Sequence, residues 1–215
     1  MKLVPQSLTC PVCAGTFTSS LVTDFEIGEK ESDFCPRYLD GNPLPQMVHF
    51  CPECGYTGFQ PDFKPIADAE RLAAVRRIVA SFGFVKGAVP SGPERFRRAA
   101  VLAVYLGKSN AEVANLYLQA TWCSRLDGEP EDAERRARKK AVEYLEKALE
   151  EDEFTDSDKP VVLYLVGELC RRLGRPTEAL LAFAKMDNYE KIEDWLAEWR
   201  ERQRELIRED RDDEA

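Results

Sequence analysis

The sequence has no long apolar run. No segment approaches the roughly 18 consecutive apolar residues that a membrane-spanning helix needs, and residues 1–9 lack the apolar stretch of a signal peptide. These absences argue against a membrane protein and against a secreted one. We therefore expect a cytoplasmic protein without membrane association, in a compartment where thiols stay reduced.

An excess of positive charge is missing as well. The chain has 30 Lys and Arg residues against 39 Asp and Glu residues, which gives a net charge of -9. Binding to a phosphate backbone usually needs a basic face. The basic run at residues 135–140 is followed closely by acidic residues, so we interpret it as a solvated helix face. Nucleic acid is therefore disfavoured as a partner.

Histidine occurs only once, as His49. Acid–base catalysis through histidine would depend on this single residue, and no nucleophile stands near it in the sequence. None of the 39 acidic residues stands out as half of a catalytic pair. His49 lies two residues before Cys51, where it could support or extend a metal site, but we favour a surface or half-buried strand residue. No catalytic residue is predicted, and an enzyme is not the favoured interpretation.

Cysteine, in contrast, occurs seven times. In a reducing compartment, such a content indicates metal binding or thiol chemistry before disulfides. Four of the cysteines form two matching motifs, Cys-Pro-Val-Cys at residues 10–13 and Cys-Pro-Glu-Cys-Gly at residues 51–55. Each Cys-x-x-Cys places two thiolates on one side of a tight turn, which suits metal–sulfur bonds of about 2.3 Å.

The two motifs together supply four sulfur ligands. Four ligands complete a tetrahedral shell and leave no position for water, which is typical of a structural rather than a catalytic site. We therefore predict one zinc ion (Zn2+) held by Cys10, Cys13, Cys51 and Cys54. Iron in the same sulfur shell, and thiols or disulfides unrelated to metal, remain the alternatives.

The composition of the chain changes near Pro65. Glycine, proline and aromatic residues are dense before this point, and the apolar residues follow a helical period after it. We predict a small, β-rich, zinc-ribbon-like head over residues 1–64 and a helical, repeat-like domain over residues 65–208. The acidic tail over residues 209–215 is expected to be disordered.

Two segments of the head have the β-forming residues of strands, Thr16–Ile27 and Gln46–Phe50, with a loop over residues 41–45 between them. Capping residues, prolines and glycines divide the remainder into seven helices. The expected helical ranges are 66–82, 93–106, 109–126, 130–150, 160–174, 176–186 and 189–207.

The later helices show the spacing of a tetratricopeptide repeat, in which small residues lie where two helices approach closely. One copy comprises Gly167, Ala179, Phe183 and Met186, and a stretched earlier copy comprises Ala120, Ala141, Leu145 and Ala148. The expected fold class is therefore α+β and mainly α, with a tetratricopeptide-like stack of about seven helices behind the head. An ordinary helical bundle is the alternative.

The chain resembles the bacterial family catalogued as domain of unknown function 2225. The residues that carry the resemblance are both cysteine motifs, Asp33-Phe34-Cys35, Tyr38, Asn42, Pro43, and the helical motifs at 116–122 and 167–174. The resemblance extends to about Met186 and implies a zinc-ribbon-like head with tetratricopeptide-like helices in a bacterial cytoplasm. It implies no reaction, because the family has no assigned activity to transfer.

The three remaining cysteines lie outside the two motifs. Cys35 is either a reactive thiol, with a pKa lowered by Arg37, or a packed or simply exposed thiol, which we favour. Cys123 and Cys170 occupy equivalent positions in the two repeat copies, which indicates core packing.

Two further features concern the helical surface. Trp195 and Trp199 lie four residues apart in the final helix and are expected to cap the stack. In tetratricopeptide-like stacks the first helix of each pair lines the concave face, which would present a tyrosine and an arginine from each pair. These residues are Tyr117 and Arg125, and Tyr164 and Arg171. Such residues suit the binding of an extended peptide or an acidic terminus. The simpler alternative is that these four residues are boundary residues that cover the stack and bind no partner.

Together these observations predict a zinc-binding interaction or scaffold module with a protein or peptide partner. The alternative is a thiol-based redox sensor that releases zinc when its cysteines are oxidised. An enzyme with an open metal site comes third, because four cysteines leave no vacancy for a substrate.

Overall fold

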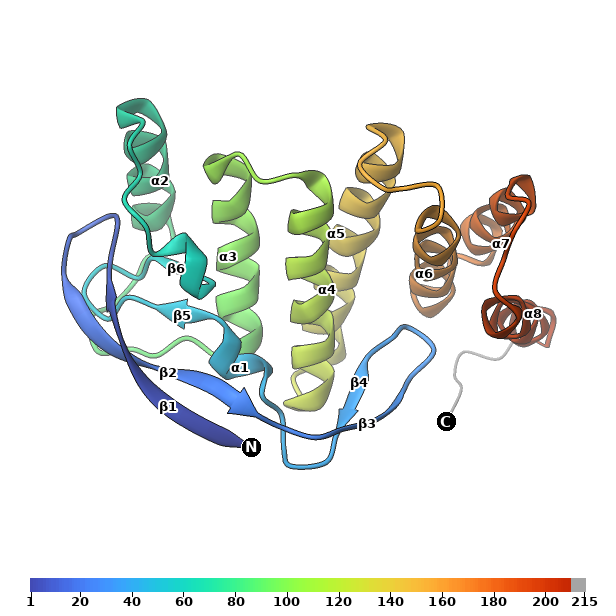
Figure 1. Ribbon diagram of the computed structural model, residues 1–215, viewed down its shortest axis with the longest axis horizontal. Coiled ribbons are helices and arrows are strands. Elements are labelled where there is room, and N and C mark those ends of the chain that lie inside the picture. The colour runs from blue at the N-terminus through green and yellow to red at the C-terminus, as the bar shows by residue number, and fades with distance from the viewer. Residues whose placement is uncertain (210–215) are drawn as a thin grey trace.

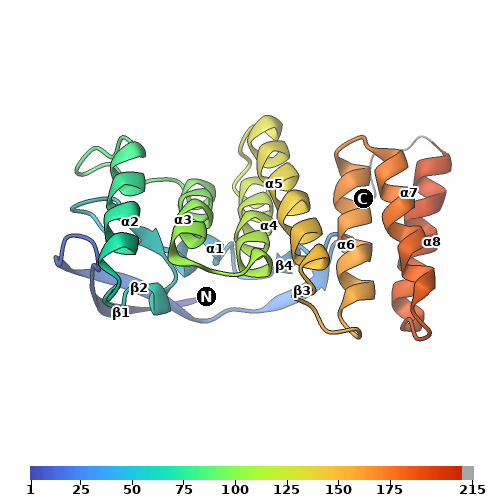
Figure 2. The same cartoon turned by 90° about the horizontal axis from the view of Figure 1, so that it is seen from above.

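The computed structural model describes residues 1–209. Within this range seven long helices follow one another in a row, and the N-terminal strands lie along one side of the row (Figures 1 and 2). The helices are α2 (Ala69–Ser81), α3 (Gly92–Leu106), α4 (Asn110–Leu126), α5 (Glu131–Glu150), α6 (Lys159–Arg172), α7 (Pro176–Lys185) and α8 (Asp194–Arg208). The predicted class, α+β and mainly α, is confirmed, and so are the places of the seven helices.

The strands form three separate antiparallel pairs. The pairs are β1 (Lys2–Thr9) with β2 (Thr16–Asp24), β3 (Ile27–Lys30) with β4 (Pro36–Tyr38), and β5 (His49–Phe50) with β6 (Thr57–Gly58). In the first and third pairs the register ends at Thr9 opposite Thr16 and at Phe50 opposite Thr57. Each cysteine motif is therefore the turn of a β-hairpin.

The strand and loop predictions need correction at two places. The predicted strand Gln46–Phe50 is right only for its last two residues, because α1 (Leu44–Met47) is a short helix, which also makes the loop prediction wrong from Leu44 onward. Pro45 in its first turn has a φ fixed near the helical value, and the buried Leu44 anchors the helix in the core.

The first strand of the chain was not predicted. Leu8 is the only fully buried residue of β1, so the strand shows almost no apolar alternation that a sequence pattern could reveal. The predicted strand Thr16–Ile27 is in fact divided, since β2 ends at Asp24 and β3 begins at Ile27.

The two helical pairs pack as the repeat copies require. A Cβ atom at Gly167 would lie 2.3 Å from the ring of Phe183, so a larger residue would push α6 and α7 apart. The equivalent residues of the α4–α5 pair are also buried, namely Ala120, Ala141, Leu145 and Ala148. The small residues thus lie where the helices approach closely.

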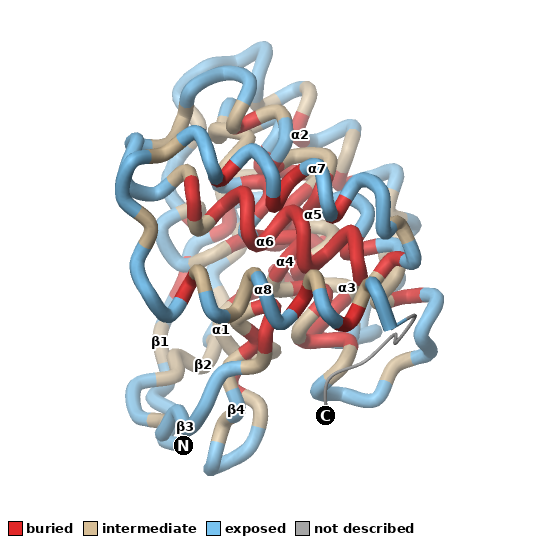
Figure 3. The backbone as a smooth tube through the Cα atoms, turned by 90° about the vertical axis from the view of Figure 1, so that its right-hand side faces the viewer, coloured by how far each residue is buried: buried red, intermediate tan, exposed pale blue. Residues whose placement is uncertain are grey.

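The head packs directly on the helical row. Leu44 and Val48 belong to one apolar cluster with helices α3 to α8, and Tyr56 belongs to a second cluster with Val75 and Val79 of α2. Buried residues, red in Figure 3, run through the helices and reach the head. The division into two domains stays a prediction, and both clusters contain residues from each side of the proposed boundary.

The last helix covers the end of the row. Trp195 and Trp199 of α8 lie where a cap was expected, and both also contact the ring of Phe34 in the head. The predicted acidic tail lies outside the described residues except for Glu209. None of the described helices combines the length and the apolar character that a membrane crossing requires.

Candidate metal centre

The two cysteine turns are built alike. In each turn the carbonyl oxygen of the first cysteine accepts a hydrogen bond from the amide four residues later. The N–O distance is 3.0 Å from Ala14 to Cys10 and 2.9 Å from Gly55 to Cys51. The similarity of the two motifs in sequence therefore extends to their backbone structure.

The residue after each motif has a left-handed backbone. The φ angle is 60° at Ala14 and 82° at Gly55. An alanine in this conformation costs roughly 1–2 kcal/mol, which the first turn tolerates. The second turn requires glycine for another reason as well, because a Cβ atom there would lie 2.7 Å from the ring of Phe84. The resulting turns direct amides at the sulfurs, with Val12 N 3.4 Å from Cys10 Sγ.

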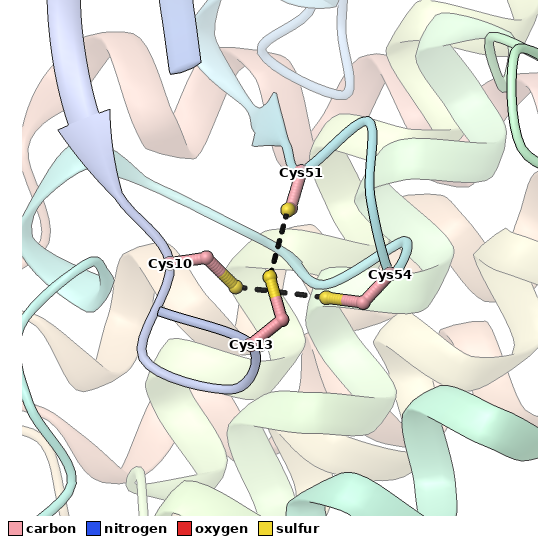
Figure 4. A group of neighbouring side chains, drawn as sticks. All are labelled: Cys10, Cys13, Cys51 and Cys54. Atoms are coloured by element: carbon pink, nitrogen blue, oxygen red, sulfur yellow. Dashed lines mark hydrogen bonds between the residues drawn. The ribbon is translucent and has the colours of Figure 1, made fainter. Parts of the chain in front are cut away.

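The turns bring four sulfur atoms together, which we call the four-cysteine cluster (Cys10, Cys13, Cys51 and Cys54). All four Sγ atoms lie within 4.8 Å of one another. The Cys10–Cys54 and Cys13–Cys51 sulfur distances are both 3.6 Å, and Figure 4 shows the four sulfurs turned toward one another. A tetrahedron with metal–sulfur bonds of about 2.3 Å has edges of about 3.8 Å. The cluster therefore has nearly the size that a tetrahedral metal ion needs.

Electrostatics also favour a cation at this position. Hydrogen bonds from Cys10 and Cys54 lower the pKa of the Cys51 thiol. The contact with Cys51 raises the pKa of Cys10, and contacts with Cys10 and Cys51 raise the pKa of Cys54. Without a metal, the Cys51 thiolate is stabilised mainly by the protons that its neighbouring thiols retain, with backbone amides adding to the effect. A soft divalent ion would replace those protons and hold all four thiolates.

The cluster lies between the hairpins and the helical row. Cys10 and Cys51 are buried, Cys54 is intermediate, and Cys13 is exposed. The buried pair belongs to the apolar cluster that contains Val79 of α2. A metal ion here would therefore join the two hairpins to each other and to α2, with the second cysteine of each motif, Cys13 and Cys54, on the side nearer to solvent.

His49 is a buried strand residue outside the four-cysteine cluster. Its Nδ1 lies 2.8 Å from Ser19 Oγ, and its ring packs edge-on against Phe63. Burial, together with the charge of Arg95, lowers its pKa, so it is neutral at pH 7. Among the described residues, the group of close metal-ligating side chains contains cysteines alone. His49 is more enclosed than the half-buried position that we expected.

The thiol of Cys35 is packed rather than reactive. The residue is 1% exposed. Burial, followed by the charge of Asp33, raises the pKa of its thiol to about 12, which is opposite to the lowering that Arg37 could have caused. Such a thiol carries almost no thiolate at pH 7. Cys123 and Cys170 are buried as well, as their equivalent repeat positions predicted.

Replacing Cys35 with serine is expected to leave the metal content unchanged. Its sulfur is not part of the four-cysteine cluster, so elemental analysis should give the wild-type ratio of metal to chain. A stability loss of about 1–2 kcal/mol is expected, because a hydroxyl replaces a buried thiol. Cys13→Ser is the matched control that removes a ligand. A Cys35→Ser protein with half the wild-type metal would contradict the assignment.

The four residues predicted to bind a partner do not form one open groove. Tyr117 stacks on Tyr144, with 5.7 Å between the ring centroids. Arg125 and Tyr164 instead bind a segment of the head, and Arg171, which is buried like Tyr164, pairs with Glu168 of its own helix. Partner binding by these residues stays a prediction, and it would require that segment to move.

Sequence reasoning missed this segment, which is the loop of the β3–β4 hairpin. We call residues 31–34 (Glu-Ser-Asp-Phe) the hairpin tip. Asp33 and Phe34 were noted only as part of a family resemblance. Two acidic residues in a short loop are a common surface pattern, so nothing local predicted that both would pair with an arginine and that Asp33 would be buried.

Comparisons with known proteins support the family resemblance. The model of a family described as an uncharacterized protein conserved in bacteria (DUF2225) matches residues 3–212. No curated protein and no solved structure gives a significant match.

Proposed function

The chain belongs to the bacterial family DUF2225, and we propose that it is a scaffold in which one structural zinc ion orders the head against a helical stack that binds a protein or peptide. The observation that carries the proposal is the four-cysteine cluster, with sulfur distances of 3.6 Å close to the edge of a zinc–thiolate tetrahedron. Four sulfurs close the metal shell, so the metal has no position left for a substrate. The repeat-like packing of α4 to α7 supports the binding role.

Zinc is the proposed metal because its filled d shell accepts a tetrahedral thiolate set without redox chemistry. Iron is the competing ion for four sulfurs. Elemental analysis of protein purified from its native cell should give about one zinc per chain and no colour. A red protein with stoichiometric iron would overturn the choice of zinc, and a metal-free, fully folded protein would overturn the structural role.

The binding role is tested by affinity purification of the full chain from native cells, with and without nuclease. We expect a protein partner that is retained in stoichiometric amount after nuclease treatment. The acidic chain has no basic excess for nucleic acid, so the partner is expected to be held directly. Capture that disappears with nuclease would contradict the proposal, because it would show that nucleic acid carries the partner.

A redox sensor is the second candidate, and the exposure of Cys13 favours it. Peroxide would oxidise a pair of cysteines to a disulfide, with two electrons passing to peroxide to form water, and the metal would leave. Zinc release at micromolar peroxide that is reversed by a thiol reductant would favour the sensor. Zinc that is retained through this treatment would leave the scaffold as the only candidate.

A further inference from the structure

The hairpin tip lies in the helical row as a bound peptide would. It is closed by hydrogen bonds from Phe34 N to Glu31 O (2.8 Å) and from Glu31 N to Cys35 O (2.9 Å). Its centre is enclosed, since Asp33 has no exposed surface and Ser32 is 9% exposed. In Figure 1 the hairpin of β3 and β4 extends away from the other strands, along the row of helices.

The acidic side chains of the tip are held by an arginine of α4. Arg125 donates to both carboxylate oxygens of Asp33, at 2.6 Å and 3.2 Å, and it also donates to Glu31. Glu134 of α5 accepts from the same guanidinium at 3.0 Å. This bidentate geometry is the one with which arginine recognises carboxylates in peptide ligands.

The backbone and the hydroxyl of Ser32 are bound by α6. Tyr164 donates to the carbonyl oxygen of Ser32 at 3.0 Å, and Arg172 donates to its Oγ at 2.9 Å. The Ser32 hydroxyl in turn donates to Glu168 at 2.7 Å. Three side chains on one face of a helix thus bind a single residue of the tip.

The aromatic end of the tip meets an aromatic surface. The ring of Phe34 stacks on Trp199 at 5.8 Å and contacts Trp195 at 6.3 Å and Tyr164 at 5.5 Å. Its φ of 64° is a left-handed conformation that a bulky residue rarely adopts. Such a strained residue persists because its contacts hold it, and strain of this kind is common at ligand clamps and switch segments.

The charge of the helical surface suits an acidic ligand. Glu134 pairs with both Arg125 and Arg138. If the tip left, this single carboxylate would remain for two arginines, and positive charge would be in excess. The tip supplies Glu31 and Asp33 at this place, so an incoming ligand would need carboxylates in the same positions.

The flank of the hairpin is open. Two cavities, of about 500 Å³ and about 760 Å³, border it and share Glu29, Lys30 and Trp199 as lining residues. Residues of α6 and α8 form the other walls of both cavities, so the cavities leave room for a second chain to approach between the hairpin and these helices.

We propose that the arginine- and tryptophan-lined surface of α4, α6 and α8 is a recognition site for peptides of the form acidic–serine–acidic–aromatic, and that the hairpin tip is its tethered occupant. We call this surface, with the tip bound to it, the tip site. The proposal rests on the proposed binding function and specifies the chemistry of the partner. A tether provides an effective concentration of about 1 mM. A peptide with a Kd of about 10 µM for the open site would therefore bind the intact protein about 100-fold more weakly.

The test uses a fluorescent peptide of residues 27–38, with serine in place of Cys35, and the full metal-loaded chain. In an opened variant, Asp33→Asn with Phe34→Ala, the tip has lost its main contacts. We expect this variant to bind the peptide at least tenfold more tightly than the wild type does. Binding should be lost when Arg172→Ala is added, and also when the peptide itself carries Asp33→Asn.

A second measurement needs no opened variant. Cys35 is buried beside the tip, so its alkylation by iodoacetamide reports the departure of the tip in the wild-type protein. Saturating peptide should raise the alkylation rate of Cys35 about tenfold, as read residue by residue with mass spectrometry. Cys170 of α6 is buried to the same degree and is the matched control, whose rate should not change.

Two results together would overturn the tip site. They are a folded, metal-loaded opened variant that binds no more tightly than the wild type, and Cys35 alkylation that does not respond to peptide. If the opened variant fails to fold, the alkylation result decides alone. In either case one zinc per chain and a captured partner would still support the scaffold, so the failures of the two proposals are distinguishable.

Discussion

The Cys51→Ser variant is expected to lose its metal and to unfold the cysteine hairpins together with α2. Binding of structural zinc contributes about 10–16 kcal/mol to small domains at neutral pH, which matches or exceeds the total stability of about 5–15 kcal/mol of a typical protein. Cys51 is also buried in the apolar cluster that contains Val75 and Val79 of α2. The loss should therefore extend beyond the two turns.

Hydrogen exchange resolved by residue is the measurement for this variant. Protection should disappear in β1, β2, β5, β6 and α2 and persist in α4 to α7, whose apolar faces bury one another. A bound metal would also close the 37-residue segment between Cys13 and Cys51, so its loss should raise the alkylation of Cys35. Cys170→Ser, which removes no ligand, is the control. A Cys51→Ser protein with full metal and wild-type stability would contradict the site.

The Arg125→Ala variant is expected to lose about 3–5 kcal/mol of stability at pH 7, because it leaves a buried carboxylate without its partner. Asp33 is fully buried. Burial alone would raise its pKa, but the hydrogen bond from Arg125 and the charges of Arg172 and Arg125 bring the pKa below its ordinary value. Asp33 is therefore ionised in the folded protein and depends on these arginines.

The stability difference between Arg125→Ala and the wild type should depend on pH, in a direction that follows from the pKa of Asp33. In the wild type the folded pKa of Asp33 is lowered, so its stabilising contribution is present above about pH 4 and is lost as the pH falls through the folded pKa. In Arg125→Ala the pKa should rise above the unfolded value. The free energy of unfolding that Arg125→Ala lacks relative to the wild type should then become smaller on acidification. Adding Asp33→Asn to the Arg125→Ala variant should restore part of the stability at pH 7.

The measurement is urea unfolding at pH 7 and near pH 4. The four proteins are the wild type, Arg125→Ala, Asp33→Asn and the variant with both substitutions, which together form a double-mutant cycle. Lys86→Ala removes an exposed ion pair with Glu53 and should change little. An Arg125→Ala protein with the wild-type unfolding midpoint at both pH values would show that the contact between Arg125 and Asp33 contributes nothing.

The helices could be predicted because their signals are local. Ser109 and Glu112 form the capping box that their spacing indicated, with N–O distances of 3.0 Å and 3.2 Å. Gly174 ends α6 with a φ of 70°, and Arg175 N donates to Cys170 O at 2.9 Å, which is the hydrogen bond of a Schellman motif. Such interactions involve residues a few positions apart, so the sequence contains both partners.

The strands were predicted less well because backbone pairing and core packing, rather than a local apolar pattern, placed these segments. β1 is almost entirely exposed and is held by backbone pairing with β2, which leaves no apolar pattern to read. Leu44–Met47 became a helix because Leu44 packs in the core beneath α3 and α4. The helices that cover Leu44 lie far along the chain, outside any local pattern.

The sequence by itself determined the four cysteines of the cluster, because two matching turns and the coordination chemistry of sulfur permit few other arrangements. It also determined the helical row and its close-contact residues. Only the tertiary structure decided that Asp33 meets Arg125, 92 residues away, and that Ser32 meets Glu168, 136 residues away. Many acidic and basic residues have compatible chemistry, and which pairs meet depends on where folding places the hairpin along the row. The same contacts turned an apparent binding groove into the position of the protein's own acidic loop.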